Sequence, residues 1–422
     1  MNHVALMLPQ IERLGGAEIQ VMHLARRLRR RGWRVTLIAL SGSGGCAARE
    51  LADEGIDLLF LGMRRGLADP PGWVRLRHWI RTEHPDILHA HLPHAAWMAR
   101  WSRILAPVRV VLDTIHTSAC GTLGRRMGYR CSNWLADAVS AVSPGAADAY
   151  TKARMAGSDR LFVISNGVDA QKWKSKPSDR AAARAALGIR DEFLWLTAGR
   201  LEPVKNFSGL LDAFASFHRD ARLVIAGSGS MKAHLQARAA NLGLASRVAF
   251  PGFQRDLLPW MQAADAFVLP SLWEGLPTVL LEAAACSLPA VATDVPGSRD
   301  VVRHGQTGLL VPQGSVPALA SALSEIMRLD PAARAFLGHN ARLHFEANFD
   351  LETVVDRWVF YYERLLHQRP TPARHGRVYP HASTRCSVPP HPPHDPPQRD
   401  PRVHALAQAE LPGTEVCDNV VE

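Results

Sequence analysis

The sequence predicts an α/β protein with two doubly wound, Rossmann-like domains. Its 422 residues exceed what one ordinary hydrophobic core accommodates. Short β-rich apolar runs alternate with helical segments, which is typical of βαβ units around a parallel sheet. The alternation stops near residue 165, in a stretch rich in turn formers and charge, and starts again near residue 193. We therefore expect two domains with a linker over residues 165–190.

The first domain is placed at residues 1–165 and the second at residues 166–348. The expected strands of the first domain are VALMLP, VTLIAL, DLLFLG, DILHAHL, RVVLDT and AVSAVS, with a helix near residues 24–31. Those of the second are FLWLTAGR, RLVIAGSGS, RVAFPGF, AFVLPS, PAVATD and GLLVP, with helices near residues 206–219 and 231–241. Such short apolar runs between turn formers are typical of buried parallel strands.

The C-terminal sequence changes character twice. Residues 351–366 have helical character and carry four aromatic side chains, so we expect a closing helix over 349–368 that packs back towards the first domain. Pro and His dominate residues 369–422, and such a segment cannot bury enough apolar surface to offset its ordering entropy. We expect a disordered tail. Its histidines could bind metal, but a solvated extension is the better interpretation.

Cysteine usage and hydropathy favour the cytoplasm. Six cysteines are scattered without CxxC pairs, which argues against a disulfide framework or a zinc knuckle and fits a reducing compartment. The first ten residues lack a basic n-region and are expected to form a strand instead of a secretory signal. No run of about 18 apolar residues occurs, so any membrane contact is expected to be peripheral.

The net charge of +10 suits nucleic acid, anionic lipid or a phosphorylated substrate. Residues 94–109 place Trp97 and Trp101 four apart, with Arg100 and Arg103 beside them, and LARRLRRRGWR adds a second basic run. Indole rings and arginines together favour an anionic membrane surface, here the inner face, or a lipid-diphosphate acceptor. The alternative is that the tryptophans belong to the core and the arginines to solvated helix faces.

The strongest chemical signal is FVLPSLWEGLPTVLLEAAACSLPAVATDVPG. A strand is expected to end at Pro270, a loop carries Glu274, and Pro277 suits the first position of a helix, whose second turn would contain Glu282. The free N–H groups at the start of that helix, those of Leu276, Thr278 and Val279, would favour an anion. A diphosphate is the expected occupant.

The spacing E-x7-E from Glu274 to Glu282, inside S-x-x-E-G-x-P, resembles the signature of the retaining glycosyltransferase family 4, which has the GT-B fold of two Rossmann-like domains facing across a cleft. Further segments resemble the family in the same order: GGAE at 15–18, SNGVD at 165–169, GRLEPVKN at 199–206, LVIAGSGS at 223–230 and VAFPGFQRD at 248–256. Together they span residues 1–366 and leave only the tail unmatched.

The resemblance implies a role for each matched residue. Arg200 and Lys205 would neutralise the donor diphosphate, a task that a divalent cation performs in enzymes with an Asp-x-Asp pair, which this chain lacks. The expected enzyme is metal-independent and needs no cofactor besides its nucleotide diphosphate sugar. Glu274 would contact hydroxyls of the transferred sugar and Glu282 those of the ribose. His116 would face the transferred sugar, where its ring or the neighbouring carbonyl could stabilise positive charge on the anomeric carbon.

The remaining donor contacts are implied by the same resemblance. Gly15 and Gly16 lack side chains where backbone must approach phosphate. The other expected donor-binding residues are Gly229, Phe253, Gln254, Gly275, Leu276, Pro277 and Thr278. The implied mechanism is front-face substitution with retention, in which the departing phosphate acts as base.

Structural alternatives exist for these residues. Both glutamates could be solvated charges, although Glu282 lies among apolar residues, where an unpaired carboxylate is costly. Arg200 and Lys205 could form ion pairs with Glu202, His116 could be a hydrogen-bonded structural group, and the paired glycines could form a simple turn. His89, His91 and His94 in HAHLPH have spacing that could hold a metal, but a role in the first-domain cleft is preferred because no carboxylate or cysteine lies close in sequence.

Three other functions have some support in the sequence. A nicotinamide oxidoreductase requires G-x-G-x-x-G after the first strand, and that pattern is missing. A nucleic-acid-binding protein would explain the charge, but no recognised reading motif accompanies it, so no nucleic-acid partner is expected. A GT-B epimerase or sucrose-type synthase stays open. We expect a hexosyltransferase of cell-surface polysaccharide or glycolipid synthesis, with UDP or GDP in the donor and a saccharide or lipid-linked acceptor.

Overall fold

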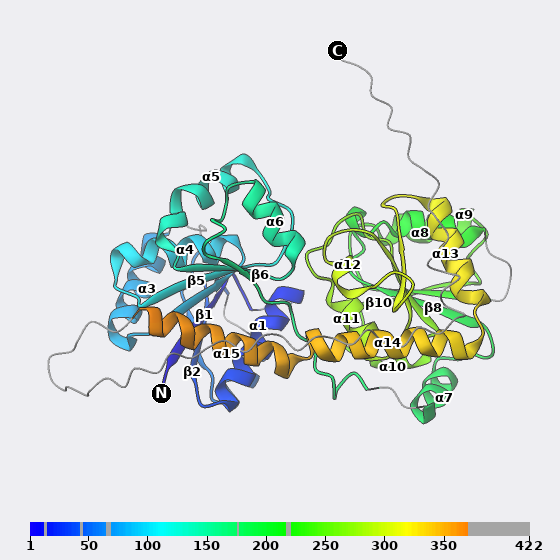
Figure 1. The fold of residues 1–422 in the computed structure, drawn as a ribbon, viewed down its shortest axis with the longest axis horizontal. Helices are drawn as coiled ribbons and strands as arrows, with labels where there is room; N and C mark the ends of the chain where they lie inside the picture. The colour runs from blue at the N-terminus through cyan, green and yellow to red at the C-terminus, as the bar shows by residue number, and fades with distance from the viewer. Residues whose placement is uncertain (12–14, 43–44, 65–68, 175–176, 217–220, 370–422) are drawn as a thin grey trace, which may run out of the picture.

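The computed structural model describes residues 1–369 except 12–14, 43–44, 65–68, 175–176 and 217–220. These residues form two α/β lobes that lie side by side, as Figure 1 shows. Each lobe has one parallel sheet with helices on both faces. The fold is the two-domain, doubly wound architecture that the sequence predicts.

The first lobe contains a seven-stranded sheet in the order β3-β2-β1-β4-β5-β6-β7. Its strands are β1 (His3–Leu8), β2 (Arg34–Ala39), β3 (Asp57–Phe60), β4 (Ile87–His91), β5 (Val110–Ile115), β6 (Ala138–Ala141) and β7 (Leu161–Val163). Its helices are α1 (Gly16–Arg30), α2 (Gly45–Asp53), α3 (Pro70–Glu83), α4 (Pro93–Leu105), α5 (Leu123–Ser132) and α6 (Pro144–Lys152), with a 3₁₀ turn η1 (Asn133–Leu135). The strand order reverses between β1 and β4, and ligands of such sheets bind outside the carboxyl ends of the strands at this point.

The second lobe contains a six-stranded sheet in the order β10-β9-β8-β11-β12-β13. Its strands are β8 (Phe193–Ala198), β9 (Ala221–Ala226), β10 (Val248–Gly252), β11 (Ala266–Leu269), β12 (Ala290–Thr293) and β13 (Gly308–Val311). Its helices are α7 (Pro177–Ala186), α8 (Phe207–Ala215), α9 (Lys232–Asn241), α10 (Leu258–Ala263), α11 (Thr278–Ala285), α12 (Ser298–Val301) and α13 (Val316–Arg328), with a 3₁₀ turn η2 (Pro203–Lys205). Here the order reverses between β8 and β11.

Side chains along the central strands point alternately to the two faces of the sheet, and each face forms one layer of the core. In β1, Leu6 packs into the core on one face of the sheet and Met7 into the core on the other. Both faces are buried because helices cover both, which explains why these strands are continuous apolar runs.

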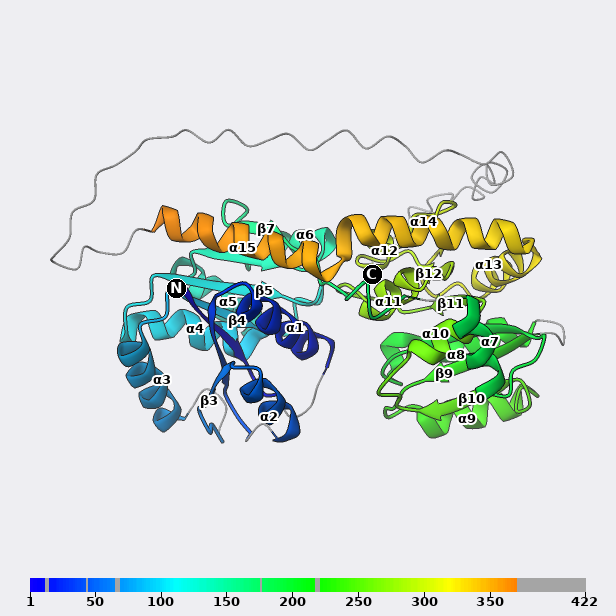
Figure 2. The same ribbon diagram turned by 90° about the horizontal axis from the view of Figure 1, so that it is seen from below.

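Two long helices join the lobes. Figure 2 shows α14 (Pro331–Phe349) and α15 (Leu351–Gln368) running in succession along one side of the molecule. Residues of α14 belong to a core of the second lobe, and residues of α15 to a core of the first. The other crossing of the chain lies beside this junction, because the N–H of Val168 donates to the carbonyl of Phe349 over 3.0 Å and the N–H of Leu351 to the carbonyl of Val168 over 3.0 Å.

Each of the twelve apolar runs named above overlaps a strand of the structure, which confirms them. Two elements depart from the expected division of the chain. β7 is a short strand at the edge of the first sheet, and α7 lies inside the expected linker, where it packs against α10 of the second lobe. Residues 217–219 of one expected helix, and the expected tail from residue 370 onward, lie outside the described residues. Among the described residues, no helix is long and apolar enough to cross a membrane.

Candidate active site

Loops at the carboxyl ends of the switch-point strands carry most of the expected site residues. Gly15 and Gly16 follow β1, Arg200 and Lys205 follow β8, and Glu274 follows β11. The topology of each sheet therefore brings these segments to the edge where doubly wound proteins bind ligands. Contacts between the lobes bring the two edges together.

The helix after Glu274 begins one residue later than expected. Pro277 is the N-cap of α11 (φ −75°, ψ 108°), and Thr278 is the first helical residue, so the placement of Pro277 at the first position was wrong. No side chain caps this end, and no protein acceptor for the N–H groups of Thr278 and Val279 is present in the described chain. Free N–H groups and the helix dipole make this end an anion-binding group.

A second helix N-terminus faces the first across the two lobes. Gly15 is the N-cap of α1, and its N–H donates to the Oε2 of Glu18 over 3.1 Å. A methyl group added at Gly16 would lie 3.8 Å from the Oγ1 of Thr278, so the start of α1 lies next to the start of α11. Two helix N-termini therefore converge on one place, which is more favourable for a diphosphate than either alone.

Lys205 and Glu274 form an ion pair in this place. The Nζ of Lys205 lies 2.5 Å from the Oε1 of Glu274, and both side chains are largely buried. The N–H of Leu272 donates to the carbonyl of Val204 over 2.8 Å, which ties the two loops together. The sequence placed Lys205 at the diphosphate and Glu274 at the sugar, and the structure brings these two side chains into direct contact.

Arg200 is exposed, and within the described residues its side chain has no hydrogen-bond or ion-pair partner. Glu202, the alternative partner for both basic residues, instead accepts from the N–H of Ser230 over 3.1 Å and from its Oγ over 2.9 Å. This contact holds the loop after β9 against the loop after β8. A Cβ at Gly229 would lie only 2.5 Å from the carbonyl oxygen of Leu201, so glycine permits this close approach.

Glu282 lies in the second turn of α11, as expected, and its surroundings are unusual for a carboxyl group. Burial raises the pKa of Glu282 to about 8, against a smaller opposing effect of Lys172. No side-chain hydrogen bond to Glu282 is present in the described chain. A recessed carboxyl group without a partner is costly unless a ligand supplies hydrogen bonds.

The part of the site around Phe253 and Gln254 is less enclosed. Phe253 and Gln254 follow β10, and the ring of Phe253 is 69% exposed. The Nε2 of Gln254 donates to the carbonyl of Pro251 over 3.0 Å, and its Oε1 accepts from the Nε1 of Trp260 over 3.4 Å. The amide of Gln254 is thus engaged within the protein, which leaves an aromatic face and backbone groups for a ligand.

His116 presents its backbone, and not its ring, to the glutamate loop. A methyl group at Gly275 would lie 2.3 Å from the carbonyl oxygen of His116, and the Oγ of Ser118 donates to the carbonyl of Glu274 over 3.0 Å. Burial lowers the pKa of the His116 ring to about 4, so the ring is neutral. Its Nε2 lies 3.0 Å from the Nδ1 of His91, whose pKa burial also lowers.

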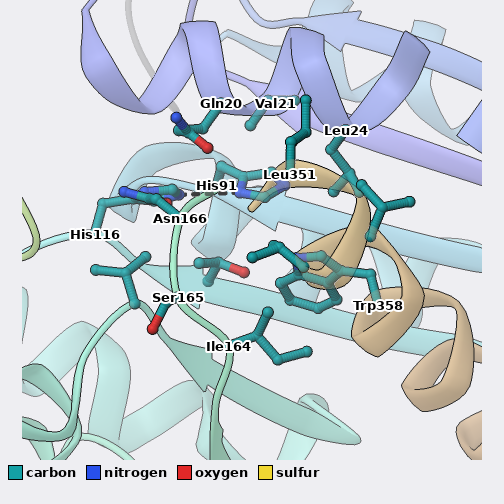
Figure 3. A pocket seen from close by; sticks show the side chains of 14 residues that line it. Gln20, Val21, Leu24, His91, His116, Ile164, Ser165, Asn166, Leu351 and Trp358 are labelled. Atoms are coloured by element: carbon teal, nitrogen blue, oxygen red, sulfur yellow. Dashed lines mark hydrogen bonds between the residues drawn. The ribbon is translucent and has the colours of Figure 1, made fainter. Parts of the chain in front are cut away.

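Figure 3 shows these two rings at a pocket that is partly open to solvent. The cavity lies between α1, the first crossing segment and α15, and its labelled lining residues are Gln20, Val21, Leu24, His91, His116, Ile164, Ser165, Asn166, Leu351 and Trp358. The sequence indicated His91 only as part of HAHLPH and did not indicate Gln20 or Trp358, because nothing local marks a residue whose partner lies hundreds of positions away.

The histidines of HAHLPH do not form a metal site with one another. His89 is bonded through its ring nitrogens to the Tyr362 hydroxyl and the Thr114 hydroxyl, each at 2.6 Å. His91 is bonded to His116, and His94 contacts the ring of Trp97. No group of three metal-binding side chains occurs in the part of the chain that is described.

The arginines expected at a membrane have partners inside the protein. Arg100 is fully buried, and its Nε lies 2.8 Å from the Oδ1 of Asp113. Arg103 pairs with Asp137 at 2.7 Å, and Trp97 packs against Tyr129. In the second basic run, the ion pairs of α1 and its C-cap include Arg26–Glu54, Arg27–Asp169, Arg27–Glu352 and Arg31–Asp356. The expectation that Arg100 faces lipid headgroups was therefore wrong.

Two protein families match the chain. "Glycosyltransferase Family 4" matches residues 14–172 and "Glycosyl transferases group 1" matches residues 179–344. A phosphatidyl-myo-inositol mannosyltransferase of Mycobacterium leprae is 30% identical over 338 residues, which cover 78% of this chain and 87% of the relative. A D-inositol 3-phosphate glycosyltransferase of Streptomyces avermitilis is 31% identical over 70% of this chain and 69% of the relative. A UDP-Gal:α-D-GlcNAc-diphosphoundecaprenol α-1,3-galactosyltransferase of Escherichia coli is 25% identical over 69% and 78%.

Solved structures share the fold. The Anabaena protein Alr3699/HepE in complex with UDP has a TM-score of 0.77 at 23% identity, covering 86% of this chain and all of that one. The sucrose-phosphate synthase of Thermosynechococcus elongatus has a TM-score of 0.77 at 23% identity, covering 87% and all of that chain. These likenesses identify the fold as GT-B.

Proposed function

Because this chain belongs to glycosyltransferase family 4 and is a glycosyltransferase, we propose that it transfers a hexose-type sugar from a nucleotide diphosphate sugar to a saccharide or lipid-linked acceptor, with retention at the anomeric carbon. One observation carries the proposal: the Lys205–Glu274 pair lies where the N-termini of α1 and α11 converge. Relatives named for phosphatidyl-myo-inositol and diphosphoundecaprenol acceptors support a lipid-linked acceptor in cell-surface polysaccharide or glycolipid synthesis.

The donor diphosphate is proposed to lie between the two helix N-termini. The N–H groups of Gly16, Thr278 and Val279 would donate to phosphate oxygens, and Arg200 and Lys205 would neutralise their charge. This charge grows as the bond from the anomeric carbon to the phosphate oxygen breaks, so the same groups stabilise the leaving group in the transition state. We propose that these cations make a divalent metal unnecessary.

The sugar and ribose are proposed to bind the two glutamates. When the diphosphate takes over the Nζ of Lys205, the Glu274 carboxylate is free to accept from sugar hydroxyls. Within the described residues the carboxyl group of Glu282 has no hydrogen-bond partner, and the two ribose hydroxyls would supply the hydrogen bonds that its burial requires. The base would stack near Phe253, which is open to solvent in the absence of donor.

Bond making and breaking would occur on one face of the sugar. The acceptor hydroxyl oxygen bonds to the anomeric carbon as the phosphate oxygen leaves, and the hydroxyl proton passes to that phosphate oxygen. Positive charge on the anomeric carbon is stabilised by the carbonyl of His116, because this carbonyl and not the ring points to the Gly275 loop. We place the reaction in the cytoplasm, in line with the free thiols of Cys120, Cys131 and Cys286.

A thermal-shift panel tests the donor site. Wild-type protein is heated with UDP-glucose, UDP-galactose, UDP-N-acetylglucosamine, GDP-mannose and the free diphosphates, with and without a chelator. Either the UDP compounds or the GDP compounds are expected to raise the Tm, by the same amount with and without chelator. Glu282→Ala is expected to abolish this rise. The control Glu363→Ala, on the exposed face of α15, keeps it. A panel without any shift, or a shift that needs a divalent ion, contradicts the proposal.

Product analysis then separates transfer from epimerisation. Labelled donor that shifts the Tm is incubated without acceptor, and the sugar is recovered and identified. A transferase returns the original sugar or its hydrolysis product, whereas an epimerase returns a changed sugar. Recovery of an epimer would overturn the transfer reaction while leaving the donor site intact.

A further inference from the structure

The segment that follows β5 carries the His116 carbonyl, and backbone hydrogen bonds do not hold this segment in place. His116 is its first residue, and the segment continues to the start of α5. Among the described residues, no backbone–backbone hydrogen bond involves residues 116–121. The position of the His116 carbonyl therefore depends on contacts that side chains make.

The ring of His116 has one hydrogen-bond partner in the described chain, the ring of His91 at the end of β4. The Nε2 of His116 lies 3.0 Å from the Nδ1 of His91, and Figure 3 shows this bond. Burial lowers the pKa of both rings, so neither ring is charged near neutral pH. Two neutral imidazoles that share a hydrogen bond have exactly one proton between them.

The bond requires the two rings to have the same tautomer. If His91 donates from Nδ1, then His116 accepts at Nε2 and carries its own proton on Nδ1. If His116 donates from Nε2, then His91 accepts at Nδ1 and carries its proton on Nε2. The other two nitrogens, Nε2 of His91 and Nδ1 of His116, are buried and have no hydrogen-bond partner in the described chain. The tautomer of His116 is therefore coupled to that of His91.

The ring of His91 packs against a ring that is fixed on both sides. His89 lies two residues earlier on the same face of β4, and the centroids of the two rings are 4.0 Å apart. The Nδ1 of His89 lies 2.6 Å from the hydroxyl of Tyr362 on α15, and its Nε2 lies 2.6 Å from the hydroxyl of Thr114 on β5. Rotation of the His89 ring would break buried hydrogen bonds, so this ring restricts the movement of His91.

His116 also faces the second lobe, through its backbone. A Cβ at Gly275 would lie 2.3 Å from the carbonyl oxygen of His116, so the two loops are in contact. Two residues further on, the Oγ of Ser118 donates to the carbonyl of Glu274 over 3.0 Å. The side chain of His116 is thus bonded to the first sheet, while its carbonyl lies against the glutamate loop.

We propose that His91 is a positioning residue for the transfer reaction: it fixes the ring orientation and tautomer of His116, and thereby the place of the His116 carbonyl. This inference rests on the proposed function, in which that carbonyl stabilises positive charge on the anomeric carbon. His91 acts through His116 and needs no contact with the substrate. Because other loops bind the donor diphosphate, loss of His91 slows the reaction step and leaves donor binding intact.

Steady-state kinetics of the full chain test this role. His91→Leu keeps an apolar side chain in the core and removes the hydrogen bond to His116. Its kcat is expected to fall roughly 100-fold. Its KM for the donor is expected to stay within about twofold of the wild-type value. His91→Asn places an amide near the position of Nδ1 and is expected to recover roughly tenfold of the lost rate, because the bond to His116 can form again.

The matched control is Ser140→Ala on β6. Ser140 is buried like His91, and its Oγ lies 2.6 Å from the Oγ1 of Thr114, so the substitution removes a buried hydrogen bond from the same sheet. It is expected to lower the Tm and to keep the wild-type kcat. A kcat that falls in proportion to the Tm in both variants would make His91 a structural residue and overturn the proposal.

Nitrogen NMR of protein that carries isotope-labelled histidine measures the tautomers without any turnover. The signals are assigned with His91→Leu and His116→Leu. In the wild type both rings are expected to show the same tautomer, and in His91→Leu the ring of His116 is expected to show a mixture of the two. Different tautomers in the wild type, or an unchanged His116 signal in His91→Leu, would overturn the proposal.

The same measurements separate this role from the proposed function. Sugar transfer and the donor-induced rise in Tm are measured on every variant. If the wild type transfers sugar and His91→Leu does so at the same rate, the positioning role is wrong and the proposed function stands. If the wild type transfers sugar from no donor that raises its Tm, the proposed function is wrong, and the positioning role is overturned with it.

Discussion

At the scale of single residues, the Lys205–Glu274 pair contributes both to the stability of the protein and to the site. In the unliganded protein each charge neutralises the other, and the pair is largely removed from water. A buried pair broken by removal of one partner leaves an uncompensated charge, so loss of either side chain affects both the stability and the site. The donor replaces this pairing with its own phosphates and hydroxyls.

Lys205→Glu is expected to abolish most transfer. The substitution puts a second carboxylate beside Glu274 and repels the diphosphate, so kcat/KM should fall by roughly 10²- to 10³-fold. Initial rates at varied donor concentration measure the loss. Lys174→Glu, an exposed lysine outside the site, serves as control for the change in net charge. Turnover within a factor of about two of wild type in Lys205→Glu would remove Lys205 from the mechanism.

Glu282 makes the stability of the empty protein depend on pH. The folded-state pKa of about 8 lies above the usual value of 4.5, so burial favours the protonated form. The cost of this burial is absent below about pH 4.5, grows as the pH rises, and is complete above about pH 8. Glu282→Gln removes the charge, so its Tm should exceed that of wild type at pH 8.5 and approach it at pH 5. Glu363→Gln should follow wild type throughout, and a constant offset for Glu282→Gln would contradict the burial argument.

Some residues could be predicted from local sequence and others could not. The segment from Glu274 to Glu282 has apolar residues and helix-start residues next to it in the sequence, so the loop and the helix could be predicted there. The partners of Arg100 and Arg27 lie on other elements, Asp113 on β5 and Glu352 on α15. An arginine beside a tryptophan has the same local sequence whether it is buried or solvated. Arg100 is buried because it pairs with a carboxylate that is distant in sequence.

At the scale of elements, strands were predictable because burial on both faces makes them apolar throughout. β7 is a run of only three apolar residues, none of them fully buried, at the edge of the sheet, and so short a run was not recognised as a strand. α7 was missed because its sequence lies in a charged stretch rich in turn formers, and its contact with α10 supplies the burial. The order of strands, and hence the two switch points, also depends on pairing between distant segments.

Gly275 couples the glutamate loop of the second lobe to the first. A Cβ here would meet the backbone of His116, which cannot turn aside as a side chain can. Gly275→Ala is therefore expected to hold the lobes apart and to lower kcat by roughly 100-fold, with little change in the Tm of the empty protein. Steady-state kinetics and small-angle scattering measure the two effects.

The control for Gly275→Ala is Gly124→Ala in α5, where the added methyl would have only the Thr122 hydroxyl, at 4.0 Å, within reach. Its kinetics and scattering profile should match those of wild type. A Gly275→Ala protein with normal kcat would show that this contact between the lobes does not occur in the reacting state.

At the scale of the whole molecule, two lobes are joined by two crossings that are bonded to each other. Val168 lies between Phe349 and Leu351 through backbone hydrogen bonds, and a Cβ at Gly167 would lie 2.9 Å from the Cα of Leu351. The cavity beside His116 borders the same crossing at Ser165 and Asn166. Movement of one lobe relative to the other must therefore pass through this junction and alter the surroundings of His116.

Arg27 of α1 forms ion pairs with both crossings of the junction. Its Nη2 lies 2.6 Å from the Oδ2 of Asp169 on the first crossing, and its Nε lies 2.5 Å from the Oε1 of Glu352 on the second. Arg27→Met keeps the apolar stem and removes both pairs, so the crossings should open more often while the lobes stay folded. We expect faster amide exchange at residues 165–172 and 349–353, and a loss of stability of about 1–2 kcal/mol. Arg29→Met is the control, because Arg29 lies on the same helix and, among the described residues, its side chain bonds only the carbonyl of Gly55. Unchanged exchange at both crossings in Arg27→Met would mean that backbone hydrogen bonds alone hold the junction, and the arginine would then have no part in how the lobes close.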